Sequence, residues 1–199
     1  MRQPRNPHSA TPALRALFVA LEEWVIDGVP PPASRVPAVS MGSAVPAAAV
    51  RLPRVNGFAH PPGGNAVTAP VDWVDPPEGG DGALYDTYVS EVDEDGNEVA
   101  GIRLPPIEVP LGTYTGWNVY RAQPQELADR DGSMIPFART RAERMAEDDL
   151  RDSLEERYGN REGYVAKVEA AAAALVDERL LLPPDAAAFV AAARQCDRF

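Results

Sequence analysis

Residues 93–118 read DEDGNEVAGIRLPPIEVPLGTYTGWN and separate a proline-rich half of the chain from a helical half. The turn-forming residues Asp95, Gly96 and Asn97 stand between two runs rich in valine, isoleucine, leucine and tyrosine. A turn of this kind between two apolar runs is a strong local signal for a β-hairpin. The sequence therefore predicts one β-hairpin, with strands over residues 85–92 and 98–104.

The second half of this stretch, residues 109–118, is rich in Pro, Gly, Thr, Tyr and Trp. Pro110 has no backbone N–H to donate, and glycine weakens both regular helices and strands. We therefore predict a shaped loop that is held in place by buried Tyr114 and Trp117. On that basis Trp117→Ala is expected to cost about 3 kcal/mol of stability or more.

Aromatic residues concentrate around the same stretch. They either anchor an irregular segment by burying large rings with polar tips, or form one wall of a substrate cleft. The anchoring role is the simpler interpretation, and the cleft stays open as an alternative. The residues concerned are Trp73, Tyr85, Tyr88, Tyr114, Trp117 and Tyr120.

The composition, with 45% hydrophobic and 25% charged residues, is that of a globular chain. Of its 21 prolines, 17 precede residue 111, so the first half is expected to consist mainly of loops, turns and edge strands. Residues 32–84 contain no long periodic segment. Because long irregular stretches inside compact domains are uncommon, we interpret them as an arm that packs on another surface.

The net charge of −11 is concentrated between residues 72 and 108, where eleven acidic residues face one basic residue, Arg103. This balance argues against nucleic acid or an anionic membrane as a partner, because phosphate binding requires clustered Lys and Arg. No apolar run is long enough to span a membrane. Residues 1–7 lack the apolar segment of a signal peptide, so a cytoplasmic location is expected.

Hydrophobic periodicity predicts helices over residues 12–27, 137–146, 153–158, 161–179 and 183–194. Thr11, Asp152 or Ser153, and Asn160 are predicted to cap three of them, and the last two helices are expected to form an antiparallel pair. The first helix has an apolar stripe that another surface must cover. This stripe consists of Leu14, Leu17, Phe18, Leu21, Trp24 and Val25.

The acidic turn at residues 93–98 does not fit a calcium-binding loop in either register. With Asp93 in the first position, the sixth residue is Glu98 where glycine is required. With Glu91 in the first position, the twelfth residue is Ile102 where a bidentate glutamate is required. A hairpin turn is therefore the preferred interpretation, and no metal site is predicted.

Catalytic residues are equally hard to assign. His8 and His60 lie in predicted loops without an identifiable nucleophile, and Cys196 is interpreted as a residue at the end of a helix. None of the seven serines stands in a Gly-x-Ser-x-Gly elbow. The alternating charges of residues 139–157 are typical of a solvated helix face. We therefore assign no catalytic, cofactor-binding or metal-binding residue, and expect no cofactor.

Several blocks nevertheless follow one another in a distinctive order. Together they cover nearly the whole chain and resemble the C-terminal part of bacterial alpha/beta-hydrolase-domain proteins. They read PALRALFVAL (12–21), WV (24–25), DGVPPPASRVP (27–37), DGNEVAGIRLP (95–105), VPLGTYTGWN (109–118), SLEERY (153–158), YV (164–165) and LLLPPDA (180–186).

The resemblance implies a parent α/β fold in which a serine on a strand-turn-helix elbow, an acid and a histidine follow in that order. It also implies hydrolysis of an ester or related acyl bond by the parent. In that family the histidine loop lies shortly before the helix that corresponds to residues 12–27. His8 falls after the expected position in unmatched surroundings, so it is not given that role. The nucleophile, the acid and the oxyanion donors are expected upstream of Met1.

The chain is therefore interpreted as a mainly helical C-terminal portion with a proline-rich arm and one β-hairpin, inactive by itself. We expect residues 1–28 to form the last helix of the hydrolase core, 29–84 the irregular arm, 85–118 the hairpin with the aromatic loop, and 119–199 a helical extension. The expected partner is the missing N-terminal hydrolase core or another protein. The alternative is a non-catalytic interaction module that docks through the apolar face of helix 12–27.

Overall fold

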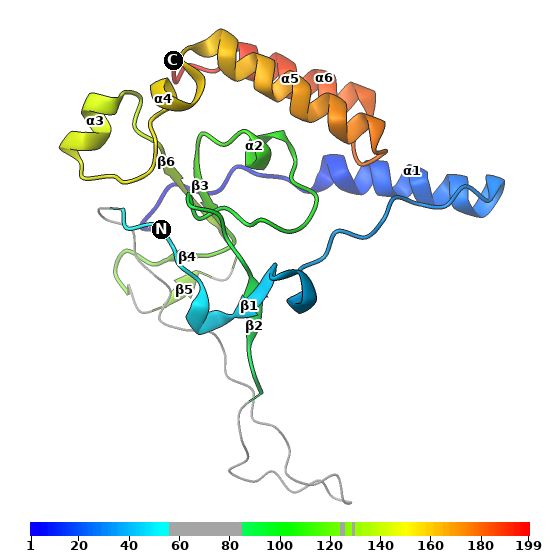
Figure 1. The fold of residues 1–199 in the computed structure, drawn as a ribbon, viewed down its shortest axis with the longest axis horizontal. Helices are drawn as coiled ribbons and strands as arrows, with labels where there is room; N and C mark the ends of the chain where they lie inside the picture. Colours follow the sequence, from blue (N-terminus) through cyan, green and yellow to red (C-terminus); the bar gives the residue numbers. More distant parts are fainter. Residues whose placement is uncertain (56–84, 124–125, 129) are drawn as a thin grey trace, which may run out of the picture.

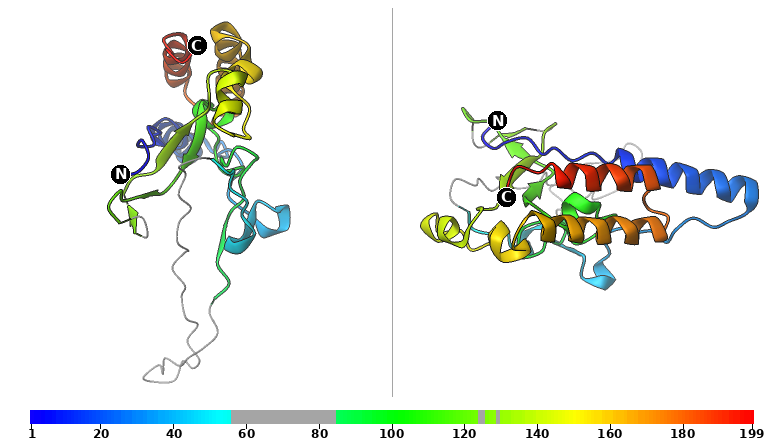
Figure 2. Two further views of the ribbon diagram at one scale, coloured as in Figure 1. Left: turned by 90° about the vertical axis from the view of Figure 1, so that its left-hand side faces the viewer. Right: turned by 90° about the horizontal axis from the view of Figure 1, so that it is seen from above.

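The structure, a computed structural model, describes residues 1–55, 85–123, 126–128 and 130–199. Helices α5 and α6 lie side by side over the strand pair β3–β6, and α1 extends past their ends (Figures 1 and 2). The helices are α1 (Thr11–Asp27), α2 (Pro105–Glu108), α3 (Arg141–Ala146), α4 (Leu154–Tyr158), α5 (Arg161–Asp177) and α6 (Pro183–Arg194), with 3-10 turns η1 (Val39–Met41) and η2 (Ala47–Ala49). The strands are β1 (Ala44–Pro46), β2 (Tyr88–Ser90), β3 (Gly112–Thr115), β4 (Asn118–Val119), β5 (Leu127–Ala128) and β6 (Ser133–Pro136).

Three antiparallel pairs, β1–β2, β3–β6 and β4–β5, make up the sheets of the described residues. In the β3–β6 pair the register runs from Gly112 opposite Pro136 to Thr115 opposite Ser133. Within the described ranges no strands pair in parallel, so this part of the chain does not contain the parallel sheet that the resemblance implies for a parent hydrolase. The division into four segments stays a prediction, and residues 56–84 of the arm lie outside the described residues.

The turn of the expected hairpin is present, and β2 lies within its predicted first strand, but residues 98–104 form no strand. The Gly96 N–H donates to the Asp93 carbonyl over 2.9 Å, Val92 and Glu98 form a bridge across the turn, and the Val99 N–H donates to the Glu91 carbonyl over 3.0 Å. Strand β2 pairs instead with β1, from a distant part of the sequence. The predicted pairing of 85–92 with 98–104 is therefore confirmed only beside the turn, at residues 91–92 and 98–99, and was wrong for β2, because a local turn signal cannot show which segment offers the better backbone partner.

The stretch 109–118 was predicted to be a shaped loop, and this was wrong for its middle part. Residues 112–115 form β3, whose four residues are all buried. Asn97 fixes this strand to the turn, because its side chain donates to the Gly112 carbonyl over 3.2 Å and accepts from the Tyr114 N–H over 2.8 Å. The predicted burial of Tyr114, now 7% exposed, is confirmed. Trp117 is only half-buried, so the cost expected for its replacement is smaller than that of a core aromatic residue.

Gly112 and Gly116 provide a matched test of this strand pair. A Cβ at Gly112 would lie 2.5 Å from the Ile135 carbonyl oxygen, whereas no described heavy atom comes within 4 Å of a Cβ at Gly116. Gly112→Ala is expected to lower the free energy of unfolding by about 1–3 kcal/mol, as overpacking does, and Gly116→Ala by much less. Urea denaturation of both variants checks this. Equal effects would contradict the close approach of β3 and β6.

Of the five predicted helix starts, three are confirmed: those of α4, α5 and α6, the last at Pro183. Ser153 caps α4 in a capping box with Glu156, and Asn160 caps α5. Helix α1, in contrast, begins at Thr11 itself, with Ala10 as its N-cap and no side-chain cap. Helix α3 begins at Arg141 behind a Thr140 capping box. This is later than predicted, because the backbone of residues 137–139 bonds instead to Leu111, Leu154 and Glu155.

The α5–α6 pair confirms the predicted C-terminal helices and carries two packed clusters. One cluster joins Ala13 of α1 and Leu104 to Ala172, Leu175 and the α5–α6 connection. The other joins Val109 to Tyr164, Val168 and Ala193. Ion pairs from Arg15 to Asp185 and from Arg179 to Glu23 hold α1 beside the same two helices. The core therefore lies between α5, α6 and the segments beneath them.

Candidate functional site

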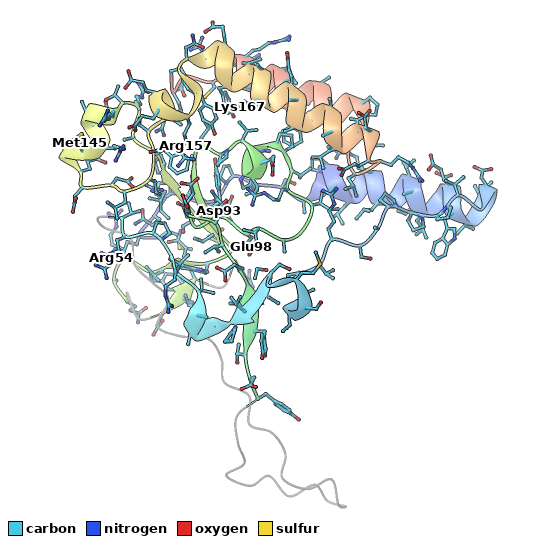
Figure 3. The ribbon with its side chains drawn as sticks, viewed as in Figure 1. Arg54, Asp93, Glu98, Met145, Arg157 and Lys167 are labelled. Atoms are coloured by element: carbon cyan, nitrogen blue, oxygen red, sulfur yellow. The ribbon has the colours of Figure 1, made fainter. Side chains whose placement is uncertain are left out.

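A charged cleft of about 240 Å³ lies between the turn at residues 93–97 and helices α4 and α5. Asp93, Arg157 and Lys167, which are labelled in Figure 3, line it. Arg157 binds both carboxylate oxygens of Asp95, one of them over 2.7 Å. The Lys167 ammonium donates to the Arg157 carbonyl over 3.1 Å. The charged side chains of this cleft therefore already bind partners within the protein.

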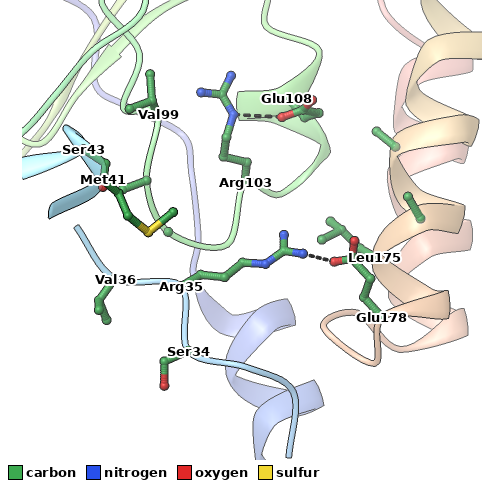
Figure 4. A pocket seen from close by; sticks show the side chains of 14 residues that line it. Ser34, Arg35, Val36, Met41, Ser43, Val99, Arg103, Glu108, Leu175 and Glu178 are labelled. Atoms are coloured by element: carbon green, nitrogen blue, oxygen red, sulfur yellow. Dashed lines mark hydrogen bonds and ion pairs between the residues drawn. The ribbon is translucent and has the colours of Figure 1, made fainter. Parts of the chain in front are cut away.

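A larger groove, of about 450 Å³, lies beside the charged cleft (Figure 4). Segment 34–43, loop 99–103 and the end of α5 form its walls. Its two arginines are paired: Arg35 with Glu178, and Arg103 with Glu108 over 2.8 Å. The groove offers no unpaired arginine to a ligand, and its shape alone does not define a chemistry.

A buried ion pair between Arg151 and Asp149 lies behind β3 and β6. All five N–H bonds of the guanidinium find acceptors. Two bind Asp149 over 3.0 and 2.6 Å, and the others bind the Thr113 hydroxyl over 2.8 Å and the Ile135 and Pro136 carbonyls over 2.9 and 3.2 Å. Burial opposes ionisation of Asp149, but the hydrogen bonds from Arg151 outweigh it, so the pKa of this carboxyl is lowered. The pair is therefore a structural crosslink.

This pair corrects the prediction that residues 139–157 form a solvated helix face. The Arg151 and Asp149 side chains are only 1% and 4% exposed, and they lie in the connection between α3 and α4. The alternation of charges along a sequence does not reveal which charged residues are buried. No signal in the sequence distinguished Arg151 from its exposed neighbours.

The aromatic residues of the middle region do not gather into one wall. Tyr114 is buried, whereas Tyr85, Tyr88 and Tyr120 are exposed. Trp73 lies outside the described residues, as does His60. His8 packs on Tyr114 with ring centroids 4.2 Å apart, and both residues line a cavity that also includes Cys196. The sequence gives no sign that His8 and Cys196 are neighbours, because they are far apart in the chain.

The serine side chains are used structurally where they are buried. The Ser133 hydroxyl lies 2.5 Å from the Thr115 hydroxyl, and the Ser153 hydroxyl caps α4. His8 Nε2, the buried ring nitrogen, has no hydrogen-bond partner among the described residues. The described part of the chain therefore does not contain a serine–histidine pair prepared for acyl transfer.

The most unusual surface of the molecule is one side of α1. Ala13, Ala16 and Ala20 of this helix are at most 7% exposed, and Ala13 belongs to the cluster that includes Ala172 and Leu175 of α5. Its large apolar residues, in contrast, are exposed. They are Leu14, Leu17, Phe18, Leu21, Trp24 and Val25, with exposures between 37% and 76%.

Two further classes of site find no support in the described residues. No group of three or more His, Cys, Asp or Glu side chains there is arranged to hold a metal ion. None of the helices in that part combines the length and the apolar character that crossing a bilayer requires.

These features define a helix-rich protein with an exposed apolar helix face. Its described part contains no nucleophile paired with a base. The chain belongs to the alpha/beta hydrolase domain family, because the model of that family matches residues 1–191. Comparisons with the curated proteins and with the solved structures found no match. The family resemblance in the sequence is thereby confirmed at the level of the family.

Proposed function

We propose that this chain is a non-catalytic, C-terminal part of an alpha/beta hydrolase and that α1 packs its apolar face on the catalytic core. That core would supply the serine nucleophile, the acid and the oxyanion donors for hydrolysis of an ester or related acyl bond. Residues 1–199 would supply a docking helix and the α5–α6 layer behind it.

The exposed face of α1 carries this proposal. Phe18, Trp24 and Val25 are 70%, 52% and 76% exposed on a helix whose alanine face is already buried. Burying one such side chain stabilises a contact by about 1.5–3 kcal/mol. Contiguous apolar surface of this kind marks an interaction site on a soluble domain.

Two observations favour a hydrolase core as the partner of α1: the family of the chain, and the absence of a Gly-x-Ser-x-Gly motif from its sequence. The family model covers nearly the whole chain, yet none of its serines stands in a Gly-x-Ser-x-Gly elbow. Hydrolysis by the serine mechanism needs an activated nucleophile within hydrogen-bond reach of a base. Both observations are explained if α1 packs on a core that carries the nucleophile and the base.

The lack of catalysis can be tested directly on residues 1–199. We expect no turnover of a p-nitrophenyl ester and no labelling by a fluorophosphonate above that of denatured protein. The control is a serine hydrolase labelled in parallel. Faster labelling of any serine in the native chain would overturn this part of the proposal.

Docking can be tested with a full-length family member that carries the Gly-x-Ser-x-Gly elbow, truncated before the block that matches residues 12–37. We expect this core to bind the chain, and the double variant Phe18→Asp, Leu21→Asp to weaken binding at least about 100-fold, because two apolar anchors are lost. Calorimetry measures the affinity.

The matched control is Met145→Asp, Leu150→Asp. Met145 and Leu150 are 65% and 73% exposed and lie around α3, away from α1 (Figure 1). This control should bind the core like the wild type. The alternative outcome is that the chain associates with itself and does not bind the core. If the α1 variant abolishes that self-association, a second copy of the chain is the partner of α1, and the proposal is overturned.

A further inference from the structure

A cavity of about 350 Å³ lies beneath α5 and α6 and is separate from the α1 face. It is open on one side and is bordered by the segment before α1, the start of α2, strands β3 and β6, and α5 and α6. Its volume is within the range of ligand pockets, which are typically about 300–1,000 Å³. Separate parts of the sequence thus meet around one space.

The walls of this cavity are largely apolar. Leu111, Met134, Val168 and Phe189 contribute aliphatic, thioether and aromatic surface. None of the described residues that line it is an Asp, Glu, Lys or Arg. Because an ion would lose its hydration here without gaining an opposite charge, the cavity disfavours charged ligands.

The polar groups of the wall are few and are held in place. The backbone N–H of His8 donates to the Asn6 side-chain oxygen over 2.9 Å, and the Asn6 side-chain amide donates to the Thr115 carbonyl over 3.1 Å. The His8 ring packs on the buried ring of Tyr114. The backbone of His8 and the position of its ring are therefore held by Asn6 and Tyr114.

One polar atom of this wall has no partner. Nε2 of His8 is buried and accepts or donates no hydrogen bond among the described residues. A buried polar atom without a partner typically costs about 1–3 kcal/mol, which a hydrogen bond from a ligand can recover. Burial also lowers the pKa of His8 to about 4, so the ring is neutral at pH 7.

We propose that this cavity is a binding site for a small, uncharged aromatic alcohol, whose ring contacts the apolar wall and whose hydroxyl bonds Nε2 of His8. A hydroxyl suits the neutral ring in either tautomer, because it can both donate and accept. Aromatic rings suit the walls formed by Tyr164, Phe189 and Met134. The site does not depend on the proposed docking of α1.

Three probes of similar shape test the chemistry of the site: p-cresol, toluene and p-toluate. We expect p-cresol to bind about 5- to 10-fold more tightly than toluene, as one net hydrogen bond allows, and p-toluate not to bind. Ligand-observed NMR at pH 7 measures the three affinities. Equal binding of p-cresol and toluene, or tighter binding of the anion, would overturn the assignment of the ligand class.

His8→Phe is the matched variant, because it keeps a ring against Tyr114 and removes the nitrogen. It is expected to lose the preference for p-cresol over toluene while its affinity for toluene changes little. A preference that persists in the folded variant would show that another group binds the hydroxyl and would overturn the role of His8.

Cys196 locates the ligand independently of that variant. It is the single cysteine of the chain, half-buried, and it lines the same cavity. Saturating p-cresol is expected to slow alkylation of Cys196 by iodoacetamide about tenfold in the wild-type protein. An unchanged rate would place p-cresol elsewhere and overturn the proposed site even if His8→Phe fails to fold.

Discussion

Arg151→Met is expected to lower the free energy of unfolding by about 3–5 kcal/mol, because it leaves the buried Asp149 carboxylate without its partner. Both side chains are nearly inaccessible to solvent. The same change also removes the donors that satisfy the Ile135 and Pro136 carbonyls at the end of β6. Urea denaturation at pH 7 measures the loss.

The matched control is Arg194→Met. Arg194 pairs with Glu169 over 2.7 Å, but their side chains are 65% and 46% exposed, and exposed ion pairs contribute about 0–1 kcal/mol. Removing Asp149 as well, in Arg151→Met, Asp149→Leu, should recover part of the lost stability by removing the unpaired charge. If Arg151→Met costs no more than Arg194→Met, the buried pair does not stabilise the protein as described.

The pH dependence of this pair has a defined sign. The pKa of Asp149 is lowered in the folded protein from its ordinary value of 3.8. Its ionised form therefore contributes stability above pH 3.8, and this contribution is lost as the pH falls through the lower folded pKa. In Arg151→Met the unpaired Asp149 carboxyl can be protonated instead. The difference in the free energy of unfolding between the wild type and Arg151→Met should therefore become smaller as the pH is lowered from about 7 to below about 4.

Phe137→Ala is expected to lower the free energy of unfolding by a similar amount, about 3–5 kcal/mol. The Phe137 side chain is among the largest that are fully buried, with 1% exposure. The guanidinium groups of Arg151 and Arg157 lie 5.0 and 4.1 Å from its ring centroid. The substitution therefore leaves a cavity and also removes two cation–π contacts.

Two further variants separate these contributions. Phe137→Leu keeps most of the apolar volume and should cost about 1–2 kcal/mol, mainly from the lost cation–π contacts. Phe18→Ala removes an equally large side chain that is 70% exposed, and it should change stability by about 0.5 kcal/mol or less. Similar losses for Phe137→Ala and Phe18→Ala in thermal or urea denaturation would contradict the burial of Phe137.

Both predictions concern a region that sequence reasoning described only in part. A cap of α4 by Asp152 or Ser153 was predicted, and the structure shows Ser153 as the cap, in a capping box with Glu156 three residues later. The burial of Arg151 and Phe137 was not, because it results from contacts with β3 and β6 at greater sequence separation. Local signals report local hydrogen bonds and do not report which charged residue a distant strand will cover.

The candidate sites, too, could be predicted from the sequence only in part. The apolar stripe on helix 12–27 could be predicted from periodicity, and the need for a surface to cover it followed from its amphipathic pattern. That the alanines are buried instead, and the large residues exposed, depends on where the rest of the folded chain lies against α1. The cavity beside His8 could not be predicted at all, because His8, Tyr114 and Cys196 meet only in the folded chain.

The sequence by itself determined the C-terminal helices with most of their caps, the turn at residues 93–97, the apolar character of α1, and the family. These depend on neighbours a few residues apart, or on blocks of sequence in a fixed order. The tertiary structure alone decided that β2 pairs with β1, that residues 112–115 form a strand against β6, that Arg151 is buried, and that His8 borders a cavity. Each of these features depends on which segments, distant in the sequence, contact one another. Those contacts are determined by the packing of the whole chain.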